Sequence, residues 1–168
     1  MALFDSLDSF GENLDPGNLT ANTAKFVGDV IDLRQDTTAR WGDNGQTGNL
    51  GIGDKMNVQF VIAENFDVAA NKNITFHVAT STTLGGREQL NAPTVVASSG
   101  PMLAANLTAG TIVTVTLPDA DYGRYLGVGI ESSVGDNNED GRFHAFMLPN
   151  DMQSSLSYVR SRGWINAG

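Results

Sequence analysis

The string "DNNEDG", which begins at Asp136, has the residue types that bind calcium. The oxygen-bearing side chains of Asp136, Asn138 and Asp140, followed by Gly141, match the first six positions of the loop pattern D-x-[DN]-x-[DN]-G. The twelfth position of such a loop is a Glu that binds the ion through both oxygens, but this chain has Met147 there, inside an apolar run. The sequence therefore predicts a polar β-turn and not an EF-hand. A looser calcium site made by Asp136, Asn138, Asp140 and water is the alternative.

The other chemically capable residues do not form a catalytic pattern. His77 and His144 each lie within an alternating apolar segment, and we expect them at the surface or in an interface, not on a metal ion. The chain has no G-x-S-x-G string, and no pair of carboxylates stands out among its 19 acidic residues. The Gly-rich stretch that begins at Trp41 lacks the spacing of a phosphate-binding loop. We therefore expect neither an enzyme nor a cofactor.

Composition excludes several further classes of protein. The chain has 168 residues, enough for one domain with its own core, and it has no Cys, so disulfides and thiolate metal sites are excluded. Its net charge of -9 argues against a nucleic-acid-binding surface, which needs clustered Lys and Arg. No apolar run approaches the roughly 20 residues of a membrane span. The N-terminal residues lack the pattern of a signal peptide. We expect a soluble protein that binds no membrane.

Period-2 alternation of apolar and polar residues dominates the chain and predicts an all-β fold. One segment, for example, places Met56, Val58 and Phe60 on one face and Asn57 and Gln59 on the other. Turn-rich links separate about seven such segments, which points to two packed antiparallel sheets, a jelly-roll-like β-sandwich. The clearest segments are 54–64, 72–81, 110–118 and 123–132, and the weaker ones are 25–33, 93–99 and 141–149.

Two terminal segments fall outside this alternation. We therefore expect an N-terminal arm over residues 1–24, the sandwich over residues 25–150 and a C-terminal arm over residues 151–168. Each arm has large apolar residues, which either wrap on their own domain or lie on a neighbour, because leaving them in water would waste their burial. The candidates for contact with a partner protein or with another copy are the aromatic and basic residues Phe4, Phe10, Tyr158, Arg160, Arg162 and Trp164.

Several strings together resemble a known family. "KFVGDVIDLRQDTTARWGDNGQTGNLGIGDKMNVQF", "ITFHVATSTTLGG", "LTAGTIVTVTLPDADYGRYLGVGIES" and "FMLPNDMQSS" lie between about residues 25 and 155. The most specific part is Arg124, Tyr125 and Leu126, which open a strand after a turn that contains Pro. In these strings the chain resembles the capsid cement, or decoration, proteins of tailed phages, the family typified by the Bordetella podophage cement protein.

The resemblance implies a structural virion protein with a jelly-roll fold and brings no catalytic residues. Such a protein is made in the bacterial cytoplasm of the host and lies on the outer surface of the phage head. It would bridge neighbouring subunits of the major capsid protein, as a dimer or trimer at local symmetry axes, and stabilise the shell against the pressure of the DNA. The long N-terminal arm departs from the shortest members of the family.

Two other functions are open on the sequence alone. The first is a carbohydrate-binding, lectin-like sandwich on a virion or cell surface, with Trp41 or Tyr122 stacking on sugar rings and nearby Asp and Asn residues binding hydroxyl groups. The second is a glycan-processing enzyme built on a jelly roll. An exposed aromatic groove would favour the first of these over a cement protein.

Overall fold

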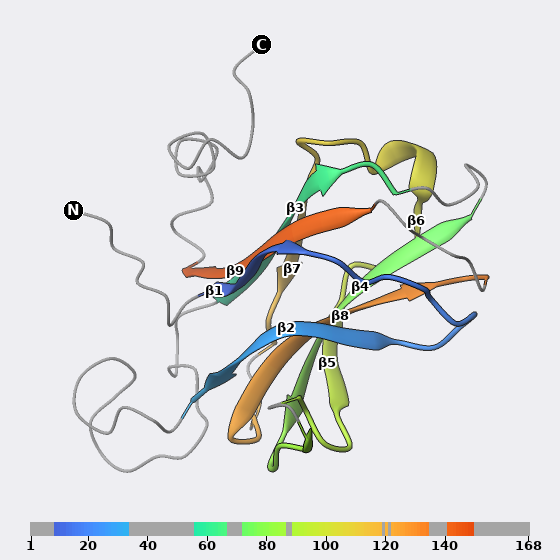
Figure 1. Cartoon of the computed structure of the whole chain (residues 1–168). Coiled ribbons are helices and arrows are strands. Elements are labelled where there is room, and N and C mark those ends of the chain that lie inside the picture. Colours follow the sequence, from blue (N-terminus) through green and yellow to red (C-terminus); the bar gives the residue numbers. More distant parts are fainter. Residues whose placement is uncertain are drawn as a thin grey trace.

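The protein is a sandwich of two antiparallel β-sheets (Figure 1). The computed structural model describes residues 9–33, 56–66, 72–86, 89–118, 120, 122–134 and 141–149. The all-β prediction is confirmed. The strands are β1 (Ser9–Leu14), β2 (Lys25–Asp32), β3 (Met56–Glu64), β4 (Asn73–Ser81), β5 (Thr94–Ser98), β6 (Met102–Leu103), β7 (Ile112–Thr116), β8 (Tyr125–Ser132) and β9 (Arg142–Pro149), with a 3-10 turn, η3, at Ala104–Asn106.

Consecutive strands cross repeatedly between the two sheets. Sheet I has the order β1-β9-β3-β7, and sheet II has the order β2-β8-β4-β5, with β6 paired to β4. The first described strand therefore lies beside the last one, as in Figure 1. This order is compatible with two Greek keys in a jelly roll, and that finer assignment stays a prediction.

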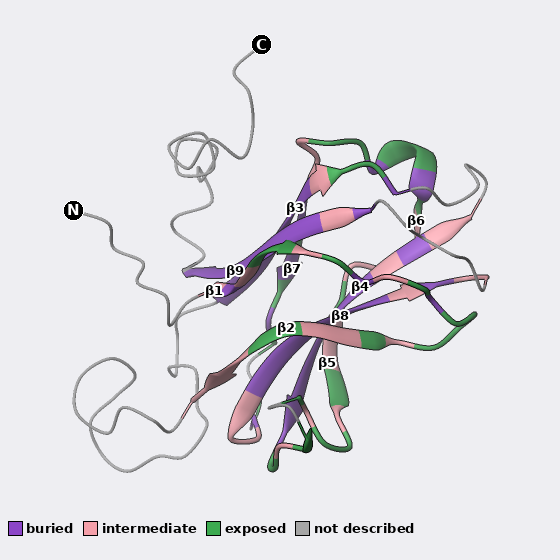
Figure 2. Cartoon of the chain, viewed as in Figure 1, coloured by how far each residue is buried: buried purple, intermediate pink, exposed green. Residues whose placement is uncertain are grey.

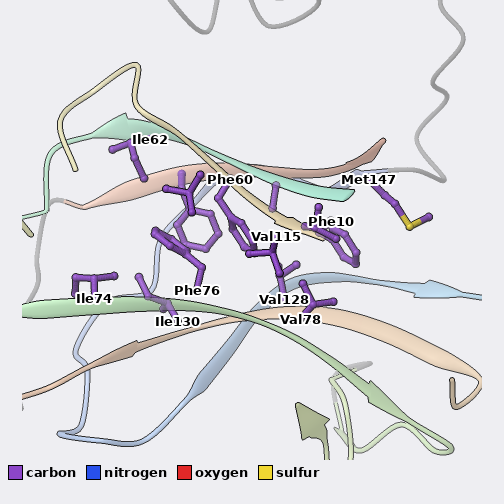
Figure 3. Packing of buried hydrophobic residues seen from close by; sticks show 14 of the residues in the cluster. Phe10, Phe60, Ile62, Ile74, Phe76, Val78, Val115, Val128, Ile130 and Met147 are labelled. Atoms are coloured by element: carbon purple, nitrogen blue, oxygen red, sulfur yellow. The ribbon is translucent and has the colours of Figure 1, made fainter. Parts of the chain in front are cut away.

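The core lies between the sheets and is filled by one face of each alternating strand (Figure 3). Its centre is a cluster of three aromatic rings contributed by both sheets. The ring centroids are 4.8 Å apart for Phe60 and Phe76, 5.8 Å for Phe60 and Phe143, and 5.6 Å for Phe76 and Phe143. Tilted and edge-on pairs at these distances are favourable beyond their buried area. Truncating such a ring to Ala typically costs about 3–5 kcal/mol, so this cluster holds the two sheets together.

The second face of β3 differs from the expectation. The alternation predicts a polar outer row, but Asn57 and Gln59 are only 1% and 3% exposed. Figure 2 shows that β3 and β9 are buried along most of their length. Asn57 is hydrogen-bonded, because its Oδ1 accepts from the hydroxyl of Thr116 at 2.7 Å. A period of two residues identifies the two faces of a strand, but it does not say whether the second face is in water.

The N-terminal boundary also needs correction. Residues 9–14, which the sequence assigns to an arm, form β1 and pair with β9 in sheet I. The pairing joins Ser9 to Phe146 and Leu14 to Phe143, with two register shifts between them, and Asn13 has a positive φ of 55°. These irregularities break the alternation, which is why the strand leaves no period-2 signal. The sandwich therefore begins by residue 9, whereas the predicted C-terminal arm, 151–168, lies outside the described residues.

One flank of the sandwich, formed by β1 and β2, connects the two sheets through close contacts, and we call it the latched flank. Gly28 in β2 has φ +82°, and a Cβ atom placed on it would lie 2.4 Å from the carbonyl oxygen of Phe10 in β1. Only Gly allows both the positive φ of residue 28 and its close approach to β1. At the end of β2, Asp32 accepts hydrogen bonds from Arg124 Nε at 3.0 Å and from Arg124 Nη2 at 2.7 Å.

Candidate functional site

The candidate calcium loop can be tested only at its last position. Asp136, Asn138 and Asp140 lie outside the described residues. Met147 is on β9, and its side chain belongs to the buried core cluster, as Figure 3 shows. A buried thioether that packs between the sheets cannot replace the bidentate Glu of a calcium loop. Within the described ranges, no group of three His, Asp or Glu residues is placed to hold a metal ion.

The two histidines do not converge, and neither is a surface residue. His77 lies on β4 in sheet II and His144 on β9 in sheet I, so they belong to different sheets. Their exposed fractions are 9% and 7%, so the prediction of surface histidines is wrong. Both residues are flanked along their strands by core side chains that point to the opposite face. The outer faces of these strands are therefore also buried at the two histidines.

Each histidine has a different electrostatic environment. His144 Nδ1 accepts a hydrogen bond from the backbone N–H of Asn13 at 3.0 Å, which ties β9 to β1. Burial lowers the pKa of the His144 imidazole below its ordinary value, while Glu12 acts in the opposite direction. His77 Nε2 lies 3.4 Å from Glu131 Oε2, a contact within sheet II. Both arrangements connect neighbouring strands, and they resemble structural contacts more than a catalytic dyad.

Of the two aromatic residues expected to stack on sugars, the structure describes Tyr122, and its position does not support that role. Tyr122 is 6% exposed and belongs to the core cluster, and its hydroxyl donates to the carbonyl oxygen of Pro118. A ring that is buried in the core cannot stack on a sugar, so this assignment is corrected. The polar tip of Tyr122 is satisfied by the nearby Pro118 carbonyl. Trp41 lies outside the described residues.

Of the six candidate interface residues, the structure describes only Phe10. Phe10 is fully buried in the core, so it cannot contact a partner, and that prediction is wrong. It faces inward because β1 is a strand of the sandwich, not an arm. The other five candidates, Phe4, Tyr158, Arg160, Arg162 and Trp164, lie outside the described residues.

The motif that opens β8 has a structural function. Arg124 makes two further contacts besides its hydrogen bonds to Asp32. Its guanidinium carbon lies 4.9 Å from the ring centroid of Tyr125, and its carbonyl oxygen accepts from the backbone N–H of Leu33 at 2.8 Å. A planar guanidinium can serve a carboxylate and an aromatic face together. These contacts hold the end of β2 against the start of β8. They give Arg124 and Tyr125 a structural role that requires no catalysis.

The flank opposite to the latched one is formed by the edge strands β5 and β7, and we call it the uncharged flank. Neither strand has a charged residue, because their sequences are TVVAS and IVTVT. Thr114 and Thr116 of β7 are exposed, and so is Val95 of β5, at 44%. Together with Leu103 on β6, at 46%, Val95 is one of the two exposed large apolar residues in the described ranges.

The backbone of β7 is paired on one side. Residues 57–61 of β3 pair with residues 112–116 without a register shift. Leu117 N–H donates to the Met56 carbonyl at 2.8 Å, and Ile62 N–H donates to the Thr111 carbonyl at 2.9 Å. In an antiparallel ladder, hydrogen-bonded residues alternate, so Val113 and Val115 bond to β3. The N–H and C=O groups of Ile112, Thr114 and Thr116 therefore point away from the sheet.

Sequence reasoning identified β7 as a strand but did not identify its free edge. The available signal was the absence of any charge, Pro or Gly within "IVTVT", whereas β1, β2, β3, β8 and β9 each contain at least one such residue. Strand order, which decides which strands are edges, comes from contacts between distant residues and is not written in a local pattern.

Comparison with known proteins adds one finding. A family model described as Bbp16 matches residues 17–147, which is most of the chain. No curated protein matches the sequence. No helix in the described part of the chain is both long and apolar enough to span a membrane.

Proposed function

Because the chain belongs to the Bbp16 family, we propose that it is a structural virion protein of a tailed phage, a cement protein that braces the outside of the head. The single observation that carries this proposal is the family match over residues 17–147. The family name is consistent with a Bordetella phage protein, and the match overlaps the region that resembles cement proteins.

The architecture supports a mechanical function. Some of the described side chains could in principle take part in catalysis or ligand binding. Tyr122, His144 and Arg124 instead pack in the core or form contacts between strands. A protein that braces a shell needs a rigid body and contact area, not a pocket, since stable interfaces bury about 1,600 Å2 in total. We therefore propose that it is not an enzyme and that it binds no cofactor.

The proposed partners are the major capsid protein and further copies of this chain, as a dimer or trimer at local symmetry axes. The C-terminal segment supplies Tyr158, Arg160, Arg162 and Trp164, and aromatic and Arg residues are the commonest anchors of interfaces. Many copies on one shell would add their small contacts as avidity. The net charge of -9 would keep free subunits apart before assembly.

The direct test is sedimentation of the purified protein with intact capsids of its phage. We expect stoichiometric co-sedimentation of the full chain. A variant that lacks residues 156–168 should bind more weakly and yet melt at the same temperature as the full chain. A chain that stays in the supernatant at all concentrations would contradict the proposed function. Normal occupancy by the shortened variant would contradict only the role of the tail.

The lectin-like alternative has less support, because one of its two named platforms, Tyr122, is buried in the core. Binding to a panel of immobilised glycans tests it separately. Saturable binding that is lost on replacing Trp41 with Ala would favour that alternative.

A further inference from the structure

The outward backbone groups of β7 form a ready-made template for another strand. Ile112, Thr114 and Thr116 each direct one N–H and one C=O away from β3, and β3 is the one strand paired with β7 among the described residues. The five paired positions follow one another without a bulge, so the edge is regular. An extended segment laid along it could form hydrogen bonds to all three residues.

Proteins usually block such edges with charges, Pro residues or bulges. The edge strands of the latched flank have these devices: β1 and β2 contain the charged residues Glu12, Lys25, Asp29 and Asp32, and both are paired through register shifts. β7 has none of them. The contrast with β1 and β2 indicates that the edge of β7 is kept able to pair.

We propose that β7 accepts an extended, uncharged segment of the capsid shell protein as a fifth strand of sheet I. The inference rests on the proposed function and names the surface through which the shell is gripped. An uncharged segment fits because Ile112, Thr114 and Thr116 offer no charge to pair with. Their side chains share one face of the strand, with Thr114 and Thr116 exposed, so the added strand would lie beside β-branched neighbours.

The size of the edge favours the shell protein over a second copy of this chain. A strand of five residues is about 17 Å long, and pairing two such edges alone falls far short of the roughly 800 Å2 per partner that a stable interface requires. A segment of the shell protein, by contrast, would add its hydrogen bonds to contacts made elsewhere by the tail. The edge therefore acts as one of several grips, which suits a protein held by avidity.

The test compares two substitutions at one position. Thr114→Pro removes an outward N–H and blocks strand addition, while it leaves the bonds of Val113 and Val115 to β3 in place, and Pro is tolerated at the edge of a sheet. Thr114→Val keeps the backbone and the branched shape. At subsaturating protein, we expect Thr114→Pro to lower occupancy on capsids about tenfold and Thr114→Val to leave it unchanged. Equal occupancy by the two variants, with the full chain binding normally, would overturn the inference and leave the proposed function intact.

Hydrogen exchange gives a second test, which uses the unmodified protein and so does not depend on whether a variant folds. In the isolated subunit, we expect the β7 peptide to have fast amides at Ile112, Thr114 and Thr116 and slow ones at Val113 and Val115. On capsids the fast amides should become slow. Fast exchange that persists on occupied capsids would overturn the inference. Protection that appears in the isolated protein as its concentration rises would identify a second copy as the occupant and would also overturn it.

Discussion

The two flanks of the sandwich treat their edge strands in opposite ways. On the latched flank, β1 and β2 are charged and paired with register shifts, and they are joined across the sheets by the contact of Gly28 with Phe10. On the uncharged flank, β7 follows β3 without interruption and carries no charge. Irregular backbone in β1 and β2 thus closes the sandwich, while the regular backbone of β7 leaves hydrogen-bonding groups at its outer edge among the described residues. The difference predicts which substitutions will harm folding and which will harm assembly.

The largest effect on stability is expected at the backbone contact of the latched flank. Gly28→Ala combines an unfavourable positive φ with a Cβ atom only 2.4 Å from a carbonyl oxygen. We expect it to lower the free energy of unfolding by at least about 2 kcal/mol. The matched control is Gly100→Ala, at φ +73° with no atom within 4 Å, which isolates the conformational strain of about 1 kcal/mol. Urea unfolding of both variants measures the difference, and equal losses would show that the contact with β1 does not close the flank.

A smaller loss is expected at the end of β2. Arg124→Gln removes the bidentate pair with Asp32 and the contact with the Tyr125 ring. We expect a lower melting temperature than in the unmodified protein, with a drop smaller than that of Gly28→Ala, because the Arg124 side chain is 42% exposed. The conservative variant Arg124→Lys should recover only part of the loss, since Lys cannot form the planar pair. Full recovery by Lys would mean that charge alone matters.

A pH dependence is expected where β1 meets β9. Burial lowers the pKa of His144 in the folded protein, so the unfolded chain binds the proton more tightly. The contribution of this residue to stability is complete above about pH 6.5 and is lost as the pH falls through the folded pKa, because the protonated ring can no longer accept the Asn13 N–H. His144→Asn keeps an acceptor without this titration. Unfolding from pH 8 to pH 5.5 should weaken the unmodified protein more than the variant, and parallel curves would contradict the prediction.

Removal of calcium is expected to have no effect on stability. Adding a chelator should leave the melting temperature unchanged, because Met147, at the clamp position of the candidate calcium loop, is buried between the sheets. Scanning calorimetry with and without chelator measures this. A clear drop would revive a calcium site made by Asp136, Asn138 and Asp140.

Local patterns predicted the regular half of this molecule well. The alternation located β3, β4, β7 and β8 and identified their inner faces correctly, because successive side chains of a strand point to opposite faces. It missed β1, where Asn13 and two register shifts break that period. It also missed the burial of Asn57, His77 and His144, because alternation separates the two faces of a strand without saying whether the second face is exposed. The free edge of β7 appeared only with the strand order, which a local pattern does not contain.

The pairing of Ser9 with Phe146 places the start of β1 beside the last residues of β9. β1 runs antiparallel to β9, so the chain enters the first strand and leaves the last one at the same pole of sheet I. Anything joined before Ser9 or after Pro149 must therefore set out from that one pole.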